Sequence, residues 1–225
     1  MELLRNIPVE VGSEEVLRKL QLDRTLAKQL QGEDLVRTAN SLIDPKVLYT
    51  IGYITNREED TTDIEGTRLA SRVLARNLEK VGRVFPYIIT IGSALEDEAS
   101  ARGILQRLFL EEAGDLALTS ARAHAEEYLV KRYELGKVSH MGPGQLDWPI
   151  EQQKELFSLF PDVEATIGVR LTKSLMMVPR KSISGVIFPR EVTFTSCQLC
   201  PREYCRSRQA AYSESLRKSY GLGAE

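Results

Sequence analysis

The sequence predicts an α+β fold in which a mixed, mainly antiparallel sheet is flanked by helices. Helical patterns dominate the middle of the chain, strand-like segments gather toward both flanks, and the regular β-α alternation of a parallel fold is missing. The composition, 42% hydrophobic and 28% charged, is that of an ordinary globular protein. Because no repeat, low-complexity tract or Gly/Ser linker marks a boundary, we expect residues 1–225 to form a single unit with a cysteine-containing C-terminal segment at about 195–225.

Hydrophobic periodicity predicts the elements of the first half of the chain. Apolar residues that recur every three or four positions indicate helices, and short β-branched or aromatic runs bounded by turn residues indicate strands. Asp44-Pro45 ends one such helical pattern, since proline disfavours the helical conformation of the residue before it. The elements expected here are, in order, helices over residues 13–20 and 24–43, a strand over 47–54, a helix over 64–81 and a strand over 84–91.

The second half begins with the longest helical stretch, from about Leu95 to Tyr133, with interruptions expected near Gly103 and Gly114. Glycines and prolines over residues 141–149 predict an ordered loop, because glycine reaches positive φ and proline fixes its own φ. The remaining expected elements are a helix over residues 150–160 and short strands over 174–178, 185–188 and 192–195.

The balance of charged residues limits the kinds of partner that we expect the protein to bind. Thirty basic residues against 32 acidic residues leave a formal net charge of −2, which creates no global field for nucleic acid or an anionic membrane surface. The N-terminal residues lack the basic segment and apolar run of a secretory signal, and no stretch approaches the ~18 apolar residues of a membrane span. We therefore expect a cytoplasmic protein that binds neither nucleic acid nor membrane.

All three cysteines, Cys197, Cys200 and Cys205, fall within nine positions near the C-terminus, too close together to cross-link the fold. The CxxC pair can direct two thiolates at one centre. Three cysteines are enough for an iron–sulfur cluster with one open iron, whereas closed zinc coordination would need a fourth ligand such as His124 or His140. The alternative is three reduced thiols in a surface turn.

The loop Gly142-Pro143-Gly144-Gln145 is the second candidate site. It lacks the spacing of a dinucleotide-binding motif, and most loops of this composition have only a structural role. A Gly-Pro-Gly turn nevertheless exposes backbone N–H and C=O groups to a ligand without side-chain obstruction. A ligand-binding loop and a structural turn both remain open from these residues alone.

Several blocks resemble the activation domain of cobalamin-dependent methionine synthase. Residues 171–188 are similar to the family's Leu-Thr-x-Ser, Met-x-Pro and Ser-Val-Ser-Gly elements with their spacing kept. Pro143-Gly144, Asp147-Trp-Pro149 and Glu151-Gln-Gln resemble the pattern of stand-alone members, as do the C-terminal cysteines. Residues 43–49 and 90–96 are also similar to family segments, so the resemblance covers most of the chain.

The resemblance implies a ligand groove that faces a corrinoid-binding protein or the methionine synthase core. It implies an accessory, methyltransferase-type component that binds S-adenosylmethionine and reactivates or methylates cobalamin carried by the partner, whose cobalt performs the chemistry. The residues to which it assigns ligand binding are His140, Gly142, Pro143, Gly144 and Gln145.

The chain departs from the family pattern at three positions. His140 replaces an arginine, Gln145 replaces a tyrosine, and Thr119 stands at the position of an acidic residue. Arginine is a fixed cation that grips a carboxylate with two hydrogen bonds, which histidine cannot reproduce. Three functions therefore stay open: an S-adenosylmethionine-binding component, an iron–sulfur or metal-binding electron-transfer or docking partner of a corrinoid protein, and a binding module without the methyl-donor site.

Overall fold

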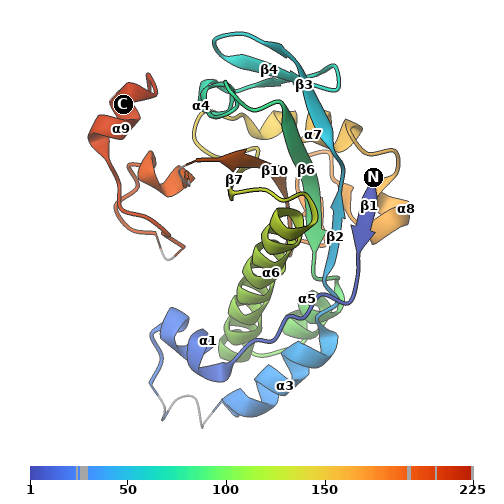
Figure 1. Ribbon diagram of the computed structural model, residues 1–225. Coiled ribbons are helices and arrows are strands. Elements are labelled where there is room, and N and C mark those ends of the chain that lie inside the picture. Colours follow the sequence, from blue (N-terminus) through green and yellow to red (C-terminus); the bar gives the residue numbers. More distant parts are fainter. Residues whose placement is uncertain (24, 26–29, 192–193, 206, 224–225) are drawn as a thin grey trace.

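Strand β6 (Arg83–Thr90) is the centre of the computed structural model, which describes residues 1–23, 25, 30–191, 194–205 and 207–223 (Figure 1). It pairs with β2 (Lys46–Tyr49) and β3 (Gly52–Arg57) along one side and with β10 (Ser182–Arg190) along the other. Every pairing among the described strands is antiparallel, which confirms the predicted α+β fold with a mainly antiparallel sheet. The other strands are β1 (Glu2–Leu4), β4 (Thr61–Ile64), β5 (Thr67–Ala70), β7 (Lys137–Met141), and the separate pair β8 (Arg170–Leu171) and β9 (Met177–Val178).

Helix α6 (Ile104–Arg132) covers one face of the sheet (Figure 1). Small side chains at four-residue spacing let the helix lie close to the strands, because a stripe of alanines lies on one side of a helix. Its N-terminal half packs against three further helices, α1 (Ser13–Leu20), α3 (Gly32–Leu42) and α5 (Ala94–Ser100). The buried alanines of the stripe are Ala113, Ala117, Ala121 and Ala125.

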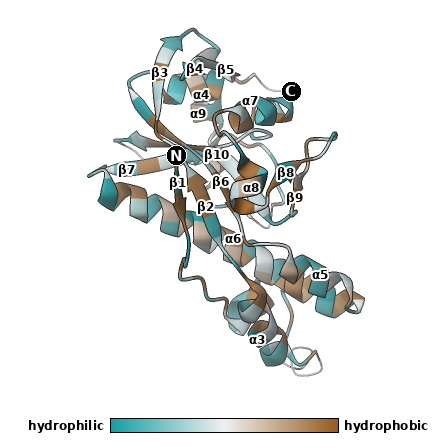
Figure 2. Ribbon diagram, turned by 90° about the vertical axis from the view of Figure 1, so that its right-hand side faces the viewer, coloured by the Kyte–Doolittle hydropathy of each residue, from teal (hydrophilic) through white to brown (hydrophobic). Residues whose placement is uncertain are grey.

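The opposite face buries alternate residues of the same strands. Leu48 and Ile88 pack against α8 (Val163–Ile167), while their neighbours in β2 and β6 point toward α6, as the two-residue period of a strand requires. Helices α7 (Gln153–Ser158) and α4 (Arg72–Asn77) complete this layer. Figure 2 shows hydrophobic residues in the central strands β2 and β6 and hydrophilic residues toward the outer end of β3.

The C-terminal segment returns to the body of the protein after β10. It contains the short 3-10 helix η2 (Ser196–Gln198) and α9 (Glu214–Ser219). Its contact with α4 includes a hydrogen bond of 2.9 Å from the Arg72 guanidinium to the Gly221 carbonyl. Tyr220 is buried, stacks on Phe194 and donates a hydrogen bond to Asn77 at 3.2 Å. These contacts fix the segment against the sheet layer that carries α4.

Two expectations for helices are wrong. Residues 61–70 form the hairpin of β4 and β5, because Glu65 and Gly66 adopt φ of 50° and 78° in a two-residue turn, and only α4 of the expected 64–81 helix exists. Gly114 does not interrupt α6. A Cβ at Gly114 would lie 3.3 Å from the Lys181 side chain, so the glycine allows a close approach of that side chain.

Other boundaries are shifted. The strand expected over 47–54 is two strands, β2 and β3, and the one expected over 174–178 is only β9. Residues 24 and 26–29 of the expected 24–43 helix, and residues 192–193 of the expected 192–195 strand, lie outside the described residues. None of the helices in the described part of the chain combines the length and hydrophobicity of a membrane span.

Candidate functional site

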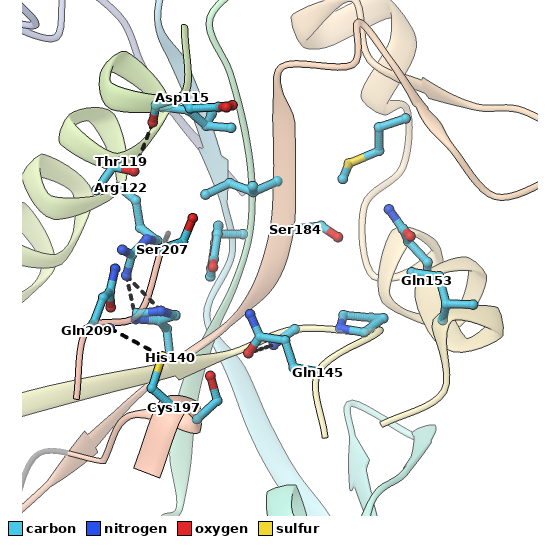
Figure 3. A pocket seen from close by; sticks show the side chains of 18 of the residues that line it. Asp115, Thr119, Arg122, His140, Gln145, Gln153, Ser184, Cys197, Ser207 and Gln209 are labelled. Carbon is cyan, nitrogen blue, oxygen red and sulfur yellow. Dashed lines mark hydrogen bonds between the residues drawn. The ribbon is translucent and has the colours of Figure 1, made fainter. Parts of the chain in front are cut away.

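A cleft of about 550 Å³ opens between α6, the loop after β7, α7 and the C-terminal segment, with β10 and β6 at its base (Figure 3). The polar and sulfur-containing residues that line it come from distant parts of the chain, and they include both of the segments that the sequence singles out. They are Tyr87, Asp115, Thr119, Arg122, His140, Gln145, Gln153, Met177, Ser184, Ser196, Cys197, Cys205, Ser207 and Gln209.

The base of the cleft depends on close backbone contact between β7 and β10. A Cβ at Gly142 would lie 2.4 Å from the Ser184 carbonyl oxygen, and a Cβ at Gly185 would lie 2.5 Å from the Met141 carbonyl oxygen. Real Cβ atoms do not approach backbone oxygens so closely, so glycine is required at both positions. Burial raises the pKa of the neighbouring Tyr87, partly offset by the Arg122 charge, and the phenol therefore stays protonated as a hydrogen-bond donor.

The predicted binding loop is an ordered turn. Gly144 has φ of 84° and donates its N–H to the Trp148 carbonyl at 2.8 Å, and Gln145 N–H donates to the Gly142 carbonyl at 3.2 Å. Trp148 is buried and donates its indole N–H to Gln152 at 2.9 Å. The loop is therefore held by its own backbone and by a buried tryptophan, so its cleft-facing residues are preorganised.

The α6 side of the cleft carries fixed charge. An Arg122 guanidinium nitrogen lies 2.7 Å from the ring nitrogens of His140, and the same nitrogen lies 2.9 Å from a Glu126 carboxylate oxygen. Glu126 also lies 2.9 Å from His140 Nδ1. In a neutral imidazole the consistent assignment has Nδ1–H donating to Glu126 and Nε2 accepting from Arg122. Arg122 thus connects the helix to β7 beside the cleft.

Burial alone would raise the pKa of Glu126. The hydrogen bond from His140 and the charge of Arg122 outweigh burial, and the pKa of Glu126 lies below its usual value of 4.5. A second charged group, Asp115, is largely exposed at the cleft and pairs with Lys181 at 2.6 Å. The charged residues of the described lining are Asp115 and Arg122, and both belong to α6, so the charge of that lining lies on one side.

The three cysteines do not converge on one common site. Cys197 and Cys205 line the cleft, whereas Cys200 is not among its described lining residues, and all three are free thiols. Cys197 Sγ accepts a hydrogen bond from the Gln209 backbone N–H at 3.4 Å. Over the described residues, no group of three or more His, Cys, Asp or Glu side chains lies close enough to hold a metal ion. The predicted iron–sulfur or zinc centre at these cysteines gains no support from this arrangement.

The cleft contains most of the residues to which the family resemblance assigned ligand binding. His140, Gly142, Pro143 and Gln145 line it, while Gly144 packs against Ile150, whose Cδ1 would be 3.2 Å from a Cβ at this glycine.

The cleft also contains residues that the sequence did not single out. They include Arg122, Ser207 and Gln209. Gln153 and Ser184 also line it, and although both lie in blocks that resemble family members, the sequence assigned neither of them a role in binding. The helical spacing of Arg122 and Glu126 could be seen in the sequence, but not the contact of that pair with His140 eighteen residues later.

Comparison with known proteins agrees with the resemblance. Residues 113–201 match the family model described as vitamin B12 dependent methionine synthase, activation domain. Among 13 matching chains of solved structures is "Crystal Structure of the MetH Reactivation Domain bound to AdoHcy", with a TM-score of 0.56 and 14% identity, covering 88% of this chain and 82% of that chain. At this identity the likeness shows a shared fold. No curated protein sequence matches the chain.

The matched residues 113–201 supply most of the cleft, from Asp115 on α6 to Cys197 on the C-terminal segment. The fold surrounding them is that of the reactivation domain over most of the chain. The resemblance to the activation domain of vitamin B12-dependent methionine synthase, drawn from the sequence, is therefore confirmed by both the family model and the fold.

Proposed function

We propose that this chain acts as one unit in the cytoplasm, as an accessory component of cobalamin-dependent methyl transfer that binds S-adenosylmethionine in the cleft. The observation that carries the proposal is the meeting of the predicted loop residues with fixed charges from α6 in one preorganised cavity. A cavity of about 550 Å³ lies within the size range of small-molecule sites.

The charges on α6 match the charged part of such a ligand. S-adenosylmethionine carries a carboxylate, an ammonium group and a sulfonium, together with a neutral adenosine. Arg122 is a fixed cation suited to the carboxylate, although the family arginine is replaced by His140. Asp115, exposed at the cleft, is an anion suited to the ammonium group.

Methyl transfer from this donor breaks the bond between sulfur and the methyl carbon and leaves a neutral thioether. The cobalamin of the partner would supply the reduced cobalt that accepts the methyl group, and this chain would contribute by holding the donor in a fixed position. A rigid loop and a glycine-dependent cleft base suit that task, because positioning requires little reorganisation on binding.

Exposed apolar side chains at cleft-lining residues, or next to them in the sequence, support docking of a corrinoid-binding partner. Ile150 lines the cleft and is 43% exposed, Met176 precedes the lining residue Met177 and is 54% exposed, and Tyr204 precedes Cys205 and is 90% exposed. Apolar residues around a ligand site are a common feature of protein interfaces. The face that would meet the partner is thus the face on which the cleft opens.

Isothermal titration with S-adenosylmethionine and S-adenosylhomocysteine tests whether the cleft binds these adenosyl compounds. Thr119 is exposed on α6 and lines the cleft, so Thr119→Trp should fill the cavity and abolish saturable binding without disturbing the core. Glu127→Trp, at another exposed position of α6, is the matched control and should bind as the wild type does. Absence of binding by the wild-type protein at millimolar ligand would contradict the methyl-donor role.

The partner is tested separately. Purified corrinoid protein should associate with the wild-type chain. The double variant that combines Met176→Glu and Tyr204→Glu should associate more weakly but keep the wild-type affinity for S-adenosylmethionine. A chain that bound the corrinoid protein but neither adenosyl compound would be a docking partner without a methyl-donor site.

A further inference from the structure

Gln153, the first residue of α7, is a buried polar side chain on the wall of the cleft. It is only 2% exposed, and Figure 3 shows its amide directed into the cavity. Among the described residues, no side chain or backbone group forms a hydrogen bond with this amide. Its polar atoms are not among the described side-chain atoms that are sealed from solvent without a partner, so the amide reaches the open space of the cleft and can form hydrogen bonds with a ligand there.

The preceding residue provides a direct contrast. The side-chain oxygen of Gln152 accepts hydrogen bonds from the Ala70 backbone N–H at 2.7 Å and from the Trp148 indole N–H at 2.9 Å. Gln152 therefore ties α7 and the loop to β5, and its role is structural. Two adjacent glutamines thus differ in one respect: one amide is used by the fold, and the other faces the cavity.

The surroundings of Gln153 are neutral. Ser184 also lines the cleft, and its hydroxyl has no hydrogen bond within the described part of the chain; Figure 3 shows it on the same side as Gln153, away from Arg122 and His140. Ile150 and Met177 add apolar surface to the lining. The charged residues of the described lining, Asp115 and Arg122, both belong to α6.

We infer that Gln153 is a specificity-determining residue that reads the edge of a purine base at the uncharged side of the cleft, with Ser184 beside it. This inference rests on the proposed function and assigns the adenine of the adenosyl ligand to this side. A carboxamide presents one donor and one acceptor side by side, which matches adjacent donor and acceptor positions on adenine. The apolar residues provide contacts for the faces of the ring.

The affinity test compares adenosine with purine riboside, which lacks the exocyclic amino group. Wild-type protein should bind adenosine more tightly than purine riboside, because only adenosine supplies the donor that Gln153 accepts. Gln153→Leu should weaken adenosine binding by roughly tenfold or more and should bind the two nucleosides almost equally. An unchanged preference for adenosine in Gln153→Leu would overturn the inference.

The stability test separates binding from a structural role. Gln153→Leu removes an amide that forms no hydrogen bond with the described residues, and it should leave the thermal midpoint of the free protein unchanged or raise it. Gln152→Leu, the matched control, should lower the midpoint because two donors lose their acceptor. A midpoint that falls as far in Gln153→Leu as in Gln152→Leu would show that Gln153 supports the fold, against the inference.

The outcomes also distinguish this inference from the proposed function. If the wild-type protein binds neither S-adenosylmethionine nor adenosine, the methyl-donor role and the base-reading role both fail. If the wild type and Gln153→Leu bind S-adenosylmethionine and both nucleosides equally, the proposed function survives and only the role of Gln153 is overturned.

Discussion

The Arg122 guanidinium lies 2.7 Å from a ring nitrogen of His140, so a fixed cation stands one hydrogen bond away from the position where the family pattern has arginine. The cation reaches this place from α6 and not from the strand that ends in the loop. Replacement of the family arginine by histidine therefore leaves a guanidinium beside the cleft. A charge at a site can be kept while the element that supplies it changes.

Arg122→Met should weaken S-adenosylmethionine binding by roughly tenfold to a hundredfold, the range for losing a hydrogen bond to a charged group. The change should be measured by isothermal titration. Arg107→Met is the matched control, because Arg107 also pairs with a glutamate four residues later on α6 but is not among the described lining residues. Equal affinity of the two variants would contradict a role for Arg122 in ligand binding.

Glu126 should make the stability of the protein depend on pH in the acidic range. Its pKa is lower in the folded state than the usual 4.5, so its stabilising contribution is complete above that pH and is lost as the pH falls through the lower folded value. The urea midpoint should therefore fall less steeply below pH 4.5 in Glu126→Gln than in the wild type. The exposed neighbour variant Glu127→Gln should follow the wild-type curve, and parallel curves for all three proteins would exclude this contribution.

Gly142→Ala should destabilise the protein by about 1–3 kcal/mol, because a Cβ there would lie 2.4 Å from the Ser184 carbonyl and force β7 away from β10. Chemical denaturation measures the change in the free energy of unfolding. Gly136→Ala is the control, since a Cβ at Gly136 meets nothing within 4 Å and its φ is not positive. The control should stay within about 0.5 kcal/mol of the wild type.

Ligand binding should slow alkylation of two of the three cysteines. Cys197 and Cys205 line the cleft, and Cys200 is an internal reference because it lies outside the described lining. Iodoacetamide labelling with peptide mass spectrometry should show lower rates at Cys197 and Cys205 when S-adenosylhomocysteine is present, with the Cys200 rate unchanged. Identical protection at all three thiols, or at none, would argue against occupancy of this cleft.

Elements with strong local signals could be predicted from the sequence. The helix from Ser13 and the buried strand β6 have clear periodicity or a continuous apolar run, and both are found close to the predicted bounds. The hairpin of β4 and β5 was missed because Ile64 and Leu69 fit a helical face as well as two strands. Only the positive φ of Glu65 and Gly66 distinguishes the hairpin from a helix. Because this turn is a single dipeptide, it leaves little signal in the sequence.

The site was only partly predictable for a different reason. His140 and the Gly142 loop are contiguous, so their resemblance to family members marks them directly. Arg122 reaches the cleft through the packing of α6 on the sheet, and its position in the sequence carries no sign of it. Gln153 lies in a block that resembles family members, but only the packing of α7 shows that its side chain lines the cleft. The unpaired amide of Gln153 in particular is a property of its surroundings and not of its residue type.

The C-terminal segment forms one wall of the cleft and follows the described strands in the sequence. The matched family region ends at residue 201, but Cys205, Ser207 and Gln209 form part of the cleft wall, and Tyr220 anchors that wall to α4. Since the chain is synthesised from its N-terminus, this wall of the cleft emerges after all the strands that the structure describes. A chain cut shortly after β10 would therefore keep the described strands of the sheet but leave the cleft open on the side of Cys205, Ser207 and Gln209.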